Sequence, residues 1–249
     1  MTGQPPRPRV AGLLLAAGAG RRFGGPKALV DTGSGPWVQR GLEILADCEP
    51  LLVVIGASSA EVAALVPGGV RVVHNSSFRQ GMGSSLRAGL VALAGSPGPG
   101  AADGVAQHEA ESAGSVDGPA GAEAVAADRQ AGAAVGTVAA AVGAGRVGAA
   151  PELIDAVVVM LVDLPGVGSA VVGRVLAAAR SAAAPRSVLA RAAFAGVPGH
   201  PVLLGREHWP GVLEMAVGDR GARDYLAGHR VTLIECGDIG SGEDVDVSS

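Results

Sequence analysis

The feature that most constrains the fold is an unbroken apolar run at residues 10–16, followed almost at once by a glycine-rich loop at 18–27. An apolar run without alternation is typical of a strand buried on both faces of a parallel sheet. Glycines at the end of such a strand let backbone N–H groups approach an anion, and this loop also carries Arg22 and Lys27. The segment therefore predicts a phosphate-binding loop.

This loop differs from the two commonest phosphate-binding motifs. A dinucleotide-binding fingerprint would need glycine at Phe23, and a Walker loop would need Gly-Lys-Ser or Gly-Lys-Thr where this chain has Pro-Lys-Ala at 26–28. A plain glycine turn is the alternative interpretation, but it leaves Arg22 and Lys27 unexplained. We therefore predict a phosphate-binding loop of another type.

Lys27 is the only lysine among the 19 Lys and Arg residues of the chain. The excess of Ala, Gly, Val, Pro and Arg indicates a GC-rich coding bias, which replaces lysine by arginine wherever either residue serves. A lysine that persists under this bias is expected where a compact, flexible charge is needed, because the planar guanidinium does not imitate it. Lys27 is therefore a candidate catalytic residue, with chance survival of a surface lysine as the alternative.

Strand and helix patterns alternate along the chain. Apolar runs predict strands over 10–16, 51–55, 70–74, 154–162 and 231–236. Apolar residues at helical spacing predict helices over 36–48, 58–67, 84–93 and 171–180, and Asp219 is a possible cap of a further helix over 221–227. Two extended segments, 187–194 and 201–204, flank a predicted turn at 196–199. This alternation indicates a mainly parallel sheet with helices on both faces, which binds ligands at the carboxyl ends of its strands.

The composition changes between residues 94 and 152, where the chain has no Leu, Ile, Met, Phe, Trp or Tyr. Such a stretch has too little apolar area to offset the entropy lost on ordering it. We therefore predict a loose tail at 1–9 and a single domain over 10–249, interrupted by a disordered Ala/Gly-rich insertion at 96–151.

Charge and apolar patterning argue against two classes of partner. The net charge is −4 and the arginines are scattered, so no basic stripe for nucleic acid is predicted. The longest apolar runs are too short to span a bilayer, and neither resembles a signal peptide. The two cysteines, Cys48 and Cys236, form neither a disulfide framework nor a zinc site. We therefore expect a cytoplasmic protein that acts on neither nucleic acid nor membranes.

Asp163 follows the apolar run at 154–162 and stands two residues before Pro165. An aspartate in this position is often a turn or N-cap residue. A phosphate loop on a neighbouring strand favours a metal ligand instead, because Mg²⁺ takes one or two carboxylates together with substrate phosphates. Asp163 is therefore a candidate ligand of Mg²⁺ or Mn²⁺.

Taken together, these segments resemble the MobA-like NTP transferases. The resemblance rests on the loop at 15–27, Gly-Met-Gly-Ser-Ser-Leu at 81–86, Leu-Val-Asp-Leu-Pro at 161–165, Gly-His-Pro-Val at 199–202, Gly-Asp-x-Gly-Ala-Arg at 218–223 and Asp-Val-Asp at 244–246. Within the family the chain is most similar to the molybdenum cofactor cytidylyltransferases. The resemblance implies a Rossmann-like three-layer α/β/α fold of the nucleotide-diphospho-sugar transferase type, a divalent metal and release of pyrophosphate.

The resemblance also implies roles for individual residues. Nucleotide binding is assigned to Ala16, Ala17, Gly18, Gly20, Arg22, Lys27, Gly81, Ser84 and Ser85. N-capping is the alternative role for the two serines. Asp246, with Asp244 as the weaker candidate, is assigned to the metal, although Val-Ser-Ser stands at 247–249 where the family usually has Thr-Pro and a helix. His200 and Arg223 are assigned to the acceptor.

We therefore predict a nucleotidyltransferase that moves a nucleoside monophosphate from an NTP to a phosphorylated small acceptor, molybdopterin or the molybdenum cofactor being the first candidate. Its catalytic residues would be Lys27, Arg22 and Asp163. Ala-Gly at 17–18 resembles the cytidylyltransferases, whereas guanylyltransferases tend to have Gly-Gly, so CTP is the predicted donor. Two alternatives stay open: a cytidylyltransferase or sugar-phosphate nucleotidyltransferase with another acceptor, and a non-catalytic nucleotide or cofactor carrier that partners a molybdoenzyme or its maturation factor.

Overall fold

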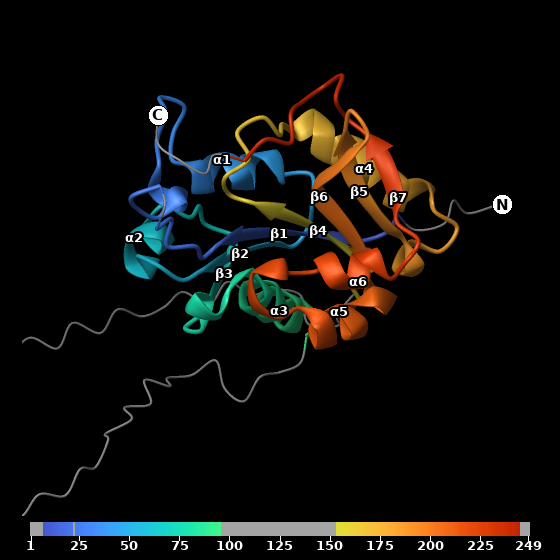
Figure 1. The fold of residues 1–249 in the computed structure, drawn as a ribbon, viewed down its shortest axis with the longest axis horizontal. Coiled ribbons are helices and arrows are strands. Elements are labelled where there is room, and N and C mark those ends of the chain that lie inside the picture. Colours follow the sequence, from blue (N-terminus) through green and yellow to red (C-terminus); the bar gives the residue numbers. More distant parts are fainter. Residues whose placement is uncertain (1–6, 22, 96–152, 245–249) are drawn as a thin grey trace, which may run out of the picture. The chain divides into compact units, whose positions relative to one another are not determined.

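A computed structural model describes residues 7–21, 23–95 and 153–244 (Figure 1). The predicted insertion at 96–151, most of the predicted tail, Arg22 and Asp246 lie outside the described residues. The described residues on both sides of 96–152 belong to one compact unit. Within those residues, no helix is long and apolar enough to cross a membrane.

One sheet forms the centre of this unit. Its strands are β1 (Val10–Ala16), β2 (Leu51–Ile55), β3 (Arg71–His74), β4 (Ala156–Leu161), β5 (Leu189–Phe194), β6 (Val197–Gly205) and β7 (Thr232–Glu235). They lie in the order β3-β2-β1-β4-β6-β5-β7, and only β6 runs antiparallel to its neighbours. The prediction of a mainly parallel sheet is confirmed.

Helices cover both faces of the sheet (Figure 1). The helices are α1 (Trp37–Ile44), α2 (Ser59–Ala64), α3 (Met82–Leu93), α4 (Ser169–Ser181), α5 (Trp209–Met215) and α6 (Arg223–Ala227). Apolar side chains of α1, α2 and α4 pack into one cluster, and those of α3, α5 and α6 pack into a second cluster. Residues of β1 belong to both clusters, which confirms the three-layer α/β/α architecture.

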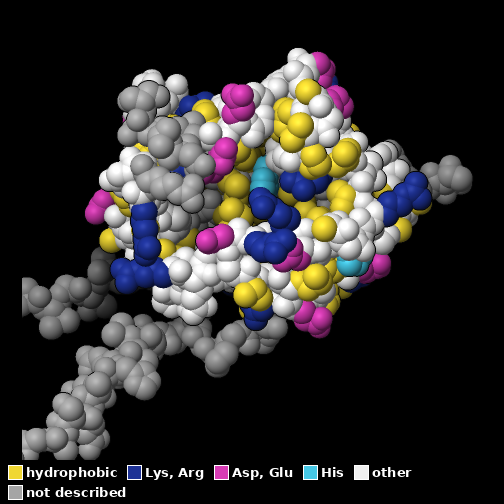
Figure 2. Space-filling model, viewed as in Figure 1, with side chains coloured by type: hydrophobic (Ala, Val, Ile, Leu, Met, Phe, Trp, Pro, Cys, Tyr) yellow, Lys and Arg dark blue, Asp and Glu magenta, His cyan; other side chains and the backbone are white. Residues whose placement is uncertain are grey.

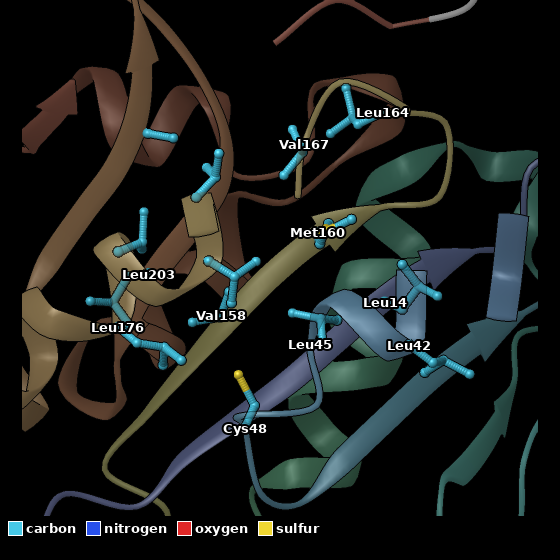
Figure 3. Close-up of a cluster of buried hydrophobic side chains, with 14 of the residues drawn as sticks. Leu14, Leu42, Leu45, Cys48, Val158, Met160, Leu164, Val167, Leu176 and Leu203 are labelled. Carbon is cyan, nitrogen blue, oxygen red and sulfur yellow. The ribbon is translucent and has the colours of Figure 1, made fainter. Parts of the chain in front are cut away.

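The central strand β1 is buried along its whole length, which explains its unbroken apolar sequence. Leu14 projects into the cluster that contains Leu42 and Leu45, as Figure 3 shows, whereas Leu13 belongs to the cluster on the opposite face. Because successive side chains of a strand alternate between faces, a strand covered on both sides needs apolar residues at every position.

Two helical glycines allow the helices to approach β1 closely from both sides. A Cβ atom on Gly41 of α1 would lie 2.8 Å from Leu14 Cδ1, and one on Gly89 of α3 would lie 2.6 Å from Leu13 Cδ1. Real Cβ atoms do not approach that closely, so a larger residue would move the helix or the leucine. Each helix thus has a glycine at the position where it packs against a leucine side chain of β1.

The predicted turn at 196–199 is wrong, because β6 already begins at Val197. The hairpin turns instead at Ala195 and Gly196, whose φ angles are 51° and 79°. The Glu235 carboxylate on β7 accepts hydrogen bonds from both of their N–H groups at 2.9 Å. A residue remote in the sequence therefore holds this turn, and a local pattern could not reveal it.

The prediction that Asp219 caps the last helix is also wrong. Asp219 lies in a single 3₁₀ turn, Gly218–Arg220, and the N-cap of α6 is Ala222. Helix α5 was not predicted from the sequence at all. Its seven residues include Pro210 and Gly211, which obscure the helical pattern.

We predict that Leu14→Ala lowers the free energy of unfolding by about 2–5 kcal/mol, because Leu14 is fully buried at the centre of the sheet. Leu233→Ala on β7 is the matched control, since Leu233 is 48% exposed and its truncation is expected to cost about 0.5 kcal/mol or less. Urea denaturation of both variants gives the two values. Equal losses would contradict the assignment of β1 as the central strand of the core.

Candidate active site

A cavity of about 520 Å³ lies where the chain leaves the carboxyl ends of β1, β3 and β4. Its wall is built from parts of 15–27 after β1, 78–85 after β3 and 161–163 after β4, together with Asp219. These strands run parallel, so their carboxyl ends meet at one edge of the sheet. The cavity is therefore at the position where ligands bind in open α/β sheets.

The glycine loop after β1 has a tight internal turn. The N–H groups of Phe23, Gly24 and Gly25 all donate to the carbonyl oxygen of Gly20, at 2.9, 2.9 and 3.2 Å. Gly20 has a φ of 56°, and a Cβ atom there would overlap the carbonyl oxygen of Gly25. Only glycine fits this position, and the turn leads the chain back to Lys27 in the cavity wall.

Lys27 and Asp163 form an ion pair across the cavity wall. The Nζ atom of Lys27 donates to Oδ2 of Asp163 at 2.8 Å, and the two side chains are only 13% and 19% exposed. The pair joins the loop after β1 to the end of β4. Low exposure strengthens the attraction, since little water screens it. The residues chosen from sequence as a cation and a metal ligand are thus in direct contact.

The described residues fit a divalent cation only if a substrate completes its shell. No group of three or more His, Cys, Asp or Glu side chains that could hold a metal occurs in the described ranges. Asp163 provides one carboxylate in the cavity wall, whereas Asp244 is exposed and does not line the cavity. Mg²⁺ typically takes one or two carboxylates plus phosphate oxygens and waters, so Asp163 suits a metal that arrives with a phosphate ligand.

Asn75 organises the start of α3. Its buried side chain donates from Nδ2 to the hydroxyl oxygens of Ser84 and Ser85, at 2.9 and 3.0 Å. Ser84 in turn donates to the carbonyls of Ser77 and Gly81, at 3.0 and 2.8 Å. Ser85 lines the main cavity, whereas Ser84 lines a neighbouring one. The N-capping alternative is wrong for both serines, because α3 begins at Met82 with Gly81 as N-cap.

A cationic cluster lies on the antiparallel side of the sheet. It contains Arg191 on β5, His200 on β6 and Arg223 at the start of α6, and Arg191 Nε donates to the Gly199 carbonyl at 3.0 Å. Burial, followed by the charges of Arg191 and Arg223, lowers the pKa of His200 to about 4. Burial and the charge of Arg223 likewise lower the pKa of Arg191. Figure 2 shows basic side chains gathered beside a histidine near the middle of the molecular face.

The structure thus brings most of the residues selected from sequence into one wall. Of these selected residues, the ones that line the cavity are Ala17, Gly18, Gly20, Lys27, Gly81, Ser85 and Asp163. Ala16 is buried in β1 beside it, and Ser84, His200 and Arg223 do not line it. Sequence reasoning missed Asn75, Arg191 and the cavity position of Asp219. A charged residue within the otherwise apolar strand β5 was the available signal for Arg191.

The model of the MobA-like NTP transferase domain matches residues 12–233. Nicotine blue oxidoreductase of Paenarthrobacter nicotinovorans is 29% identical over 96% of this chain and 93% of its own length. A probable molybdenum cofactor guanylyltransferase of Bacillus cytotoxicus is 40% identical over 30% of this chain and 37% of its own length.

Solved structures share the fold. The Rv0371c homologue of Mycobacterium sp. strain JC1 is 22% identical, with a TM-score of 0.62 over 97% of this chain and 92% of that chain. A nucleotidyl transferase of Methanothermobacter has a TM-score of 0.57 at 17% identity, over 92% and 87% of the two chains. Rv0371c of Mycobacterium tuberculosis, solved as a complex with manganese, has a TM-score of 0.58 at 18% identity, over 93% and 89%.

We predict that His200 stays neutral well below the ordinary histidine range, because burial and two arginine charges oppose its protonation. A ¹H–¹³C NMR titration should place its midpoint at about 4, rather than at 6.5. Arg223→Gln removes one of the opposing charges and should raise that midpoint. A midpoint near 6.5 in the unmodified protein would contradict the burial of His200 between the arginines.

The same shift has a consequence for stability. Between pH 6.5 and about 4 the unfolded chain binds a proton at His200 that the folded chain does not bind. The free energy of unfolding therefore contains a His200 contribution that falls as the pH is lowered through this window. His200→Gln should remove this contribution, which urea denaturation at several pH values can measure.

Proposed function

Since this chain belongs to the MobA-like NTP transferase family, we propose that it transfers CMP from CTP to a phosphorylated small acceptor and releases pyrophosphate. The observation that carries the proposal is the Lys27–Asp163 pair in the wall of a cavity that the glycine loop also lines. This arrangement offers one ammonium group for phosphate oxygens and one carboxylate for a divalent metal. The roles given below to individual residues are part of this proposal.

The reaction is a single in-line displacement. An oxygen of the acceptor phosphate attacks the α-phosphorus of CTP, the bond to the β-phosphate oxygen breaks, and pyrophosphate leaves. Lys27 binds phosphate oxygens and stabilises the charge that moves onto the leaving group, as Arg22 is also expected to do. Such catalysis consists of positioning and electrostatic stabilisation, so it needs no nucleophilic side chain.

Asp163 would hold the divalent metal in this scheme, and a bound metal would supply positive charge to the phosphate oxygens. Without nucleotide, Lys27 occupies one oxygen of that carboxylate. Phosphate oxygens compete with Asp163 for the same ammonium group. Nucleotide binding is therefore expected to weaken the ion pair and to leave the carboxylate available to the metal.

The cationic cluster on β5, β6 and α6 suits a phosphorylated acceptor. Arg191 and Arg223 repel each other in the absence of an anion, and the planar guanidinium forms paired hydrogen bonds with phosphate. His200 is neutral near pH 7, so its ring can offer a hydrogen bond to the acceptor but adds no charge. We propose the molybdenum cofactor as the first acceptor to test, in keeping with the name of the Bacillus relative. Delivery of the product to a molybdoenzyme or its maturation factor would follow.

A second candidate function comes from the relative matched over 93% of its own length, which is named an oxidoreductase. Hydride transfer would need a nicotinamide or flavin cofactor. Phe23 stands where a dinucleotide-binding fingerprint would have glycine, which disfavours the common way of binding one. Pyrophosphate release and NADH consumption, measured side by side, separate the two functions.

The test of the proposed function combines each of four nucleotides with each of several phosphorylated acceptors. Pyrophosphate release is measured for every combination. We predict that kcat/KM is higher for CTP than for GTP. The Ala17 side chain lines the cavity beside the glycine loop and leaves less room there for a base than glycine would. Ala17→Gly should reduce this preference. Equal or faster turnover of GTP by the unmodified protein would refute the cytidylyltransferase assignment, and nucleotide binding without pyrophosphate release would favour a carrier.

We predict that Lys27→Ala lowers kcat/KM by roughly two to three orders of magnitude, the effect of removing one preorganised charge-stabilising group. Lys27→Arg should restore only part of the rate, since a planar fork does not fit the space of an ammonium group. Asp163→Asn keeps the shape of the side chain and should lower metal-dependent turnover by a similar factor.

The control for these variants is Arg180→Ala, which removes an exposed charge from the end of α4, away from the cavity wall. Melting temperatures are measured for all variants, because loss of a structural contact at Asp163 would lower stability as well as turnover. Full activity in Lys27→Ala or Asp163→Asn would contradict the proposed catalytic site.

A further inference from the structure

Asp219 lines the cavity, yet the proposed transfer reaction gives it no role. Its side chain is exposed, and no described residue donates a hydrogen bond or forms an ion pair with it. The adjacent Arg220 pairs with Asp224 instead, at 2.6 Å. A carboxylate repels phosphate groups, so its presence in a cavity for a nucleoside triphosphate calls for a hydrogen-bond donor on another part of the ligand.

The position of Asp219 identifies that part of the ligand. A Cβ atom on Gly81 would lie 2.5 Å from Asp219 Oδ1, so the turn that carries Asp219 lies directly against the segment after β3. In the sheet order β3-β2-β1-β4, this segment and Asp163 flank the glycine loop from opposite sides. If Lys27 and Asp163 bind the triphosphate, Asp219 lies at the other end of the cavity, where the nucleobase would be.

The contact between this turn and α3 is built into the backbone. A Cβ atom on Gly83 would lie 2.6 Å from the carbonyl oxygen of Ala216, and Gly81 has a φ of 104°. Larger residues at either position would push the 216–219 segment away. The two glycines therefore hold Asp219 at the cavity wall.

Ser85 provides a second polar group at the same end. Its side chain is only 5% exposed, and its oxygen accepts a hydrogen bond from Asn75 at 3.0 Å. Within the described residues its own hydroxyl proton has no acceptor, so it is available to a ligand in the cavity. This end of the cavity thus presents the Ser85 hydroxyl as a donor and the Asp219 carboxylate as an anionic acceptor, beside the exposed guanidinium of Arg79.

These two groups match cytosine better than uracil. Cytosine has a 4-amino donor beside its N3 and O2 acceptors, whereas uracil has an O4 acceptor in place of the amino group. Carboxylates recognise cytosine in nucleic acids by accepting a hydrogen bond from this amino group. The O4 atom of uracil would face the carboxylate with two acceptors opposed, which is unfavourable because neither supplies a proton.

We propose that Asp219 determines base specificity by accepting a hydrogen bond from the 4-amino group of CTP, while the Ser85 hydroxyl donates to N3 or O2 of the same base. The inference rests on the proposed function, since it assumes that the cavity binds a nucleoside triphosphate. It adds a reason for discrimination between CTP and UTP, which the charge-stabilising residues cannot provide. Asp219 does not account for discrimination against GTP, because guanine also carries N–H donors that a carboxylate could accept from. That discrimination depends on the larger size of the purine.

The experiment compares CTP and UTP with the full chain, by Kd from calorimetry in the presence of Mg²⁺ and by kcat/KM from pyrophosphate release. Asp219→Asn can accept from cytosine and can also donate to O4 of uracil. We expect it to lower the CTP/UTP ratio of affinities by about tenfold or more, the scale of one base-reading contact. Asp219→Ala should weaken CTP binding and should not weaken UTP binding, because it removes the acceptor that opposes O4 of uracil.

The matched control is Asp224→Asn, which makes the same chemical change on α6 outside the cavity wall and should preserve the ratio. A wild-type chain that binds CTP and UTP equally would overturn the inference, as would an Asp219→Asn variant with an unchanged ratio. If Asp219→Ala weakened both nucleotides equally, the carboxylate would contact the ribose or hold Gly81, and base reading would be wrong. Absence of CTP binding to the wild type would instead refute the proposed function.

Discussion

The parallel pairing of β1 with β2 on one side and β4 on the other is the constraint on which the rest of the structure depends. It buries β1 on both faces and brings the segments that follow β1, β3 and β4 to one edge of the sheet. The Lys27–Asp163 pair then bridges two of these segments. Packing of apolar side chains therefore positions two charged groups that are 136 residues apart in the sequence.

Positive and negative side chains alternate in and beside the cavity, which suits a transferase with several ligands better than a site that binds a single anion. Asp163 pairs with Lys27, Asp219 lies beside Gly81 with no ion-pair partner among the described residues, and Arg191 and Arg223 lie on the antiparallel side of the sheet. The nucleobase, triphosphate and phosphorylated acceptor of the proposed reaction would present complementary groups to these residues. The oxidoreductase name of one relative shows that a related chain carries a different assignment, and chemistry is decided by site residues rather than by the fold.

The residues that could be predicted share one property: local sequence alone determines their position. The bounds of β1 and β2 agree with the predicted strands to the residue, because each strand coincides with an apolar run that begins and ends sharply in the sequence. Asp163 follows such a strand closely, and Lys27 stands at the end of the glycine loop that follows β1. The hairpin turn, by contrast, depends on Glu235 from a distant strand, and Asn75 acts through two serines of a later helix.

The sequence by itself determined a mainly parallel α/β fold and a glycine loop that only glycine can form at position 20. It also placed a lysine at the end of that loop and an aspartate just after a strand, because strand periodicity and glycine backbone freedom are local properties. Only the tertiary structure decided that Lys27 meets Asp163, that Arg191 and Arg223 flank His200, and that Asp219 faces the cavity instead of capping a helix. These contacts join segments far apart in the chain, and the packing of helices on the sheet, which no local pattern encodes, sets their distances.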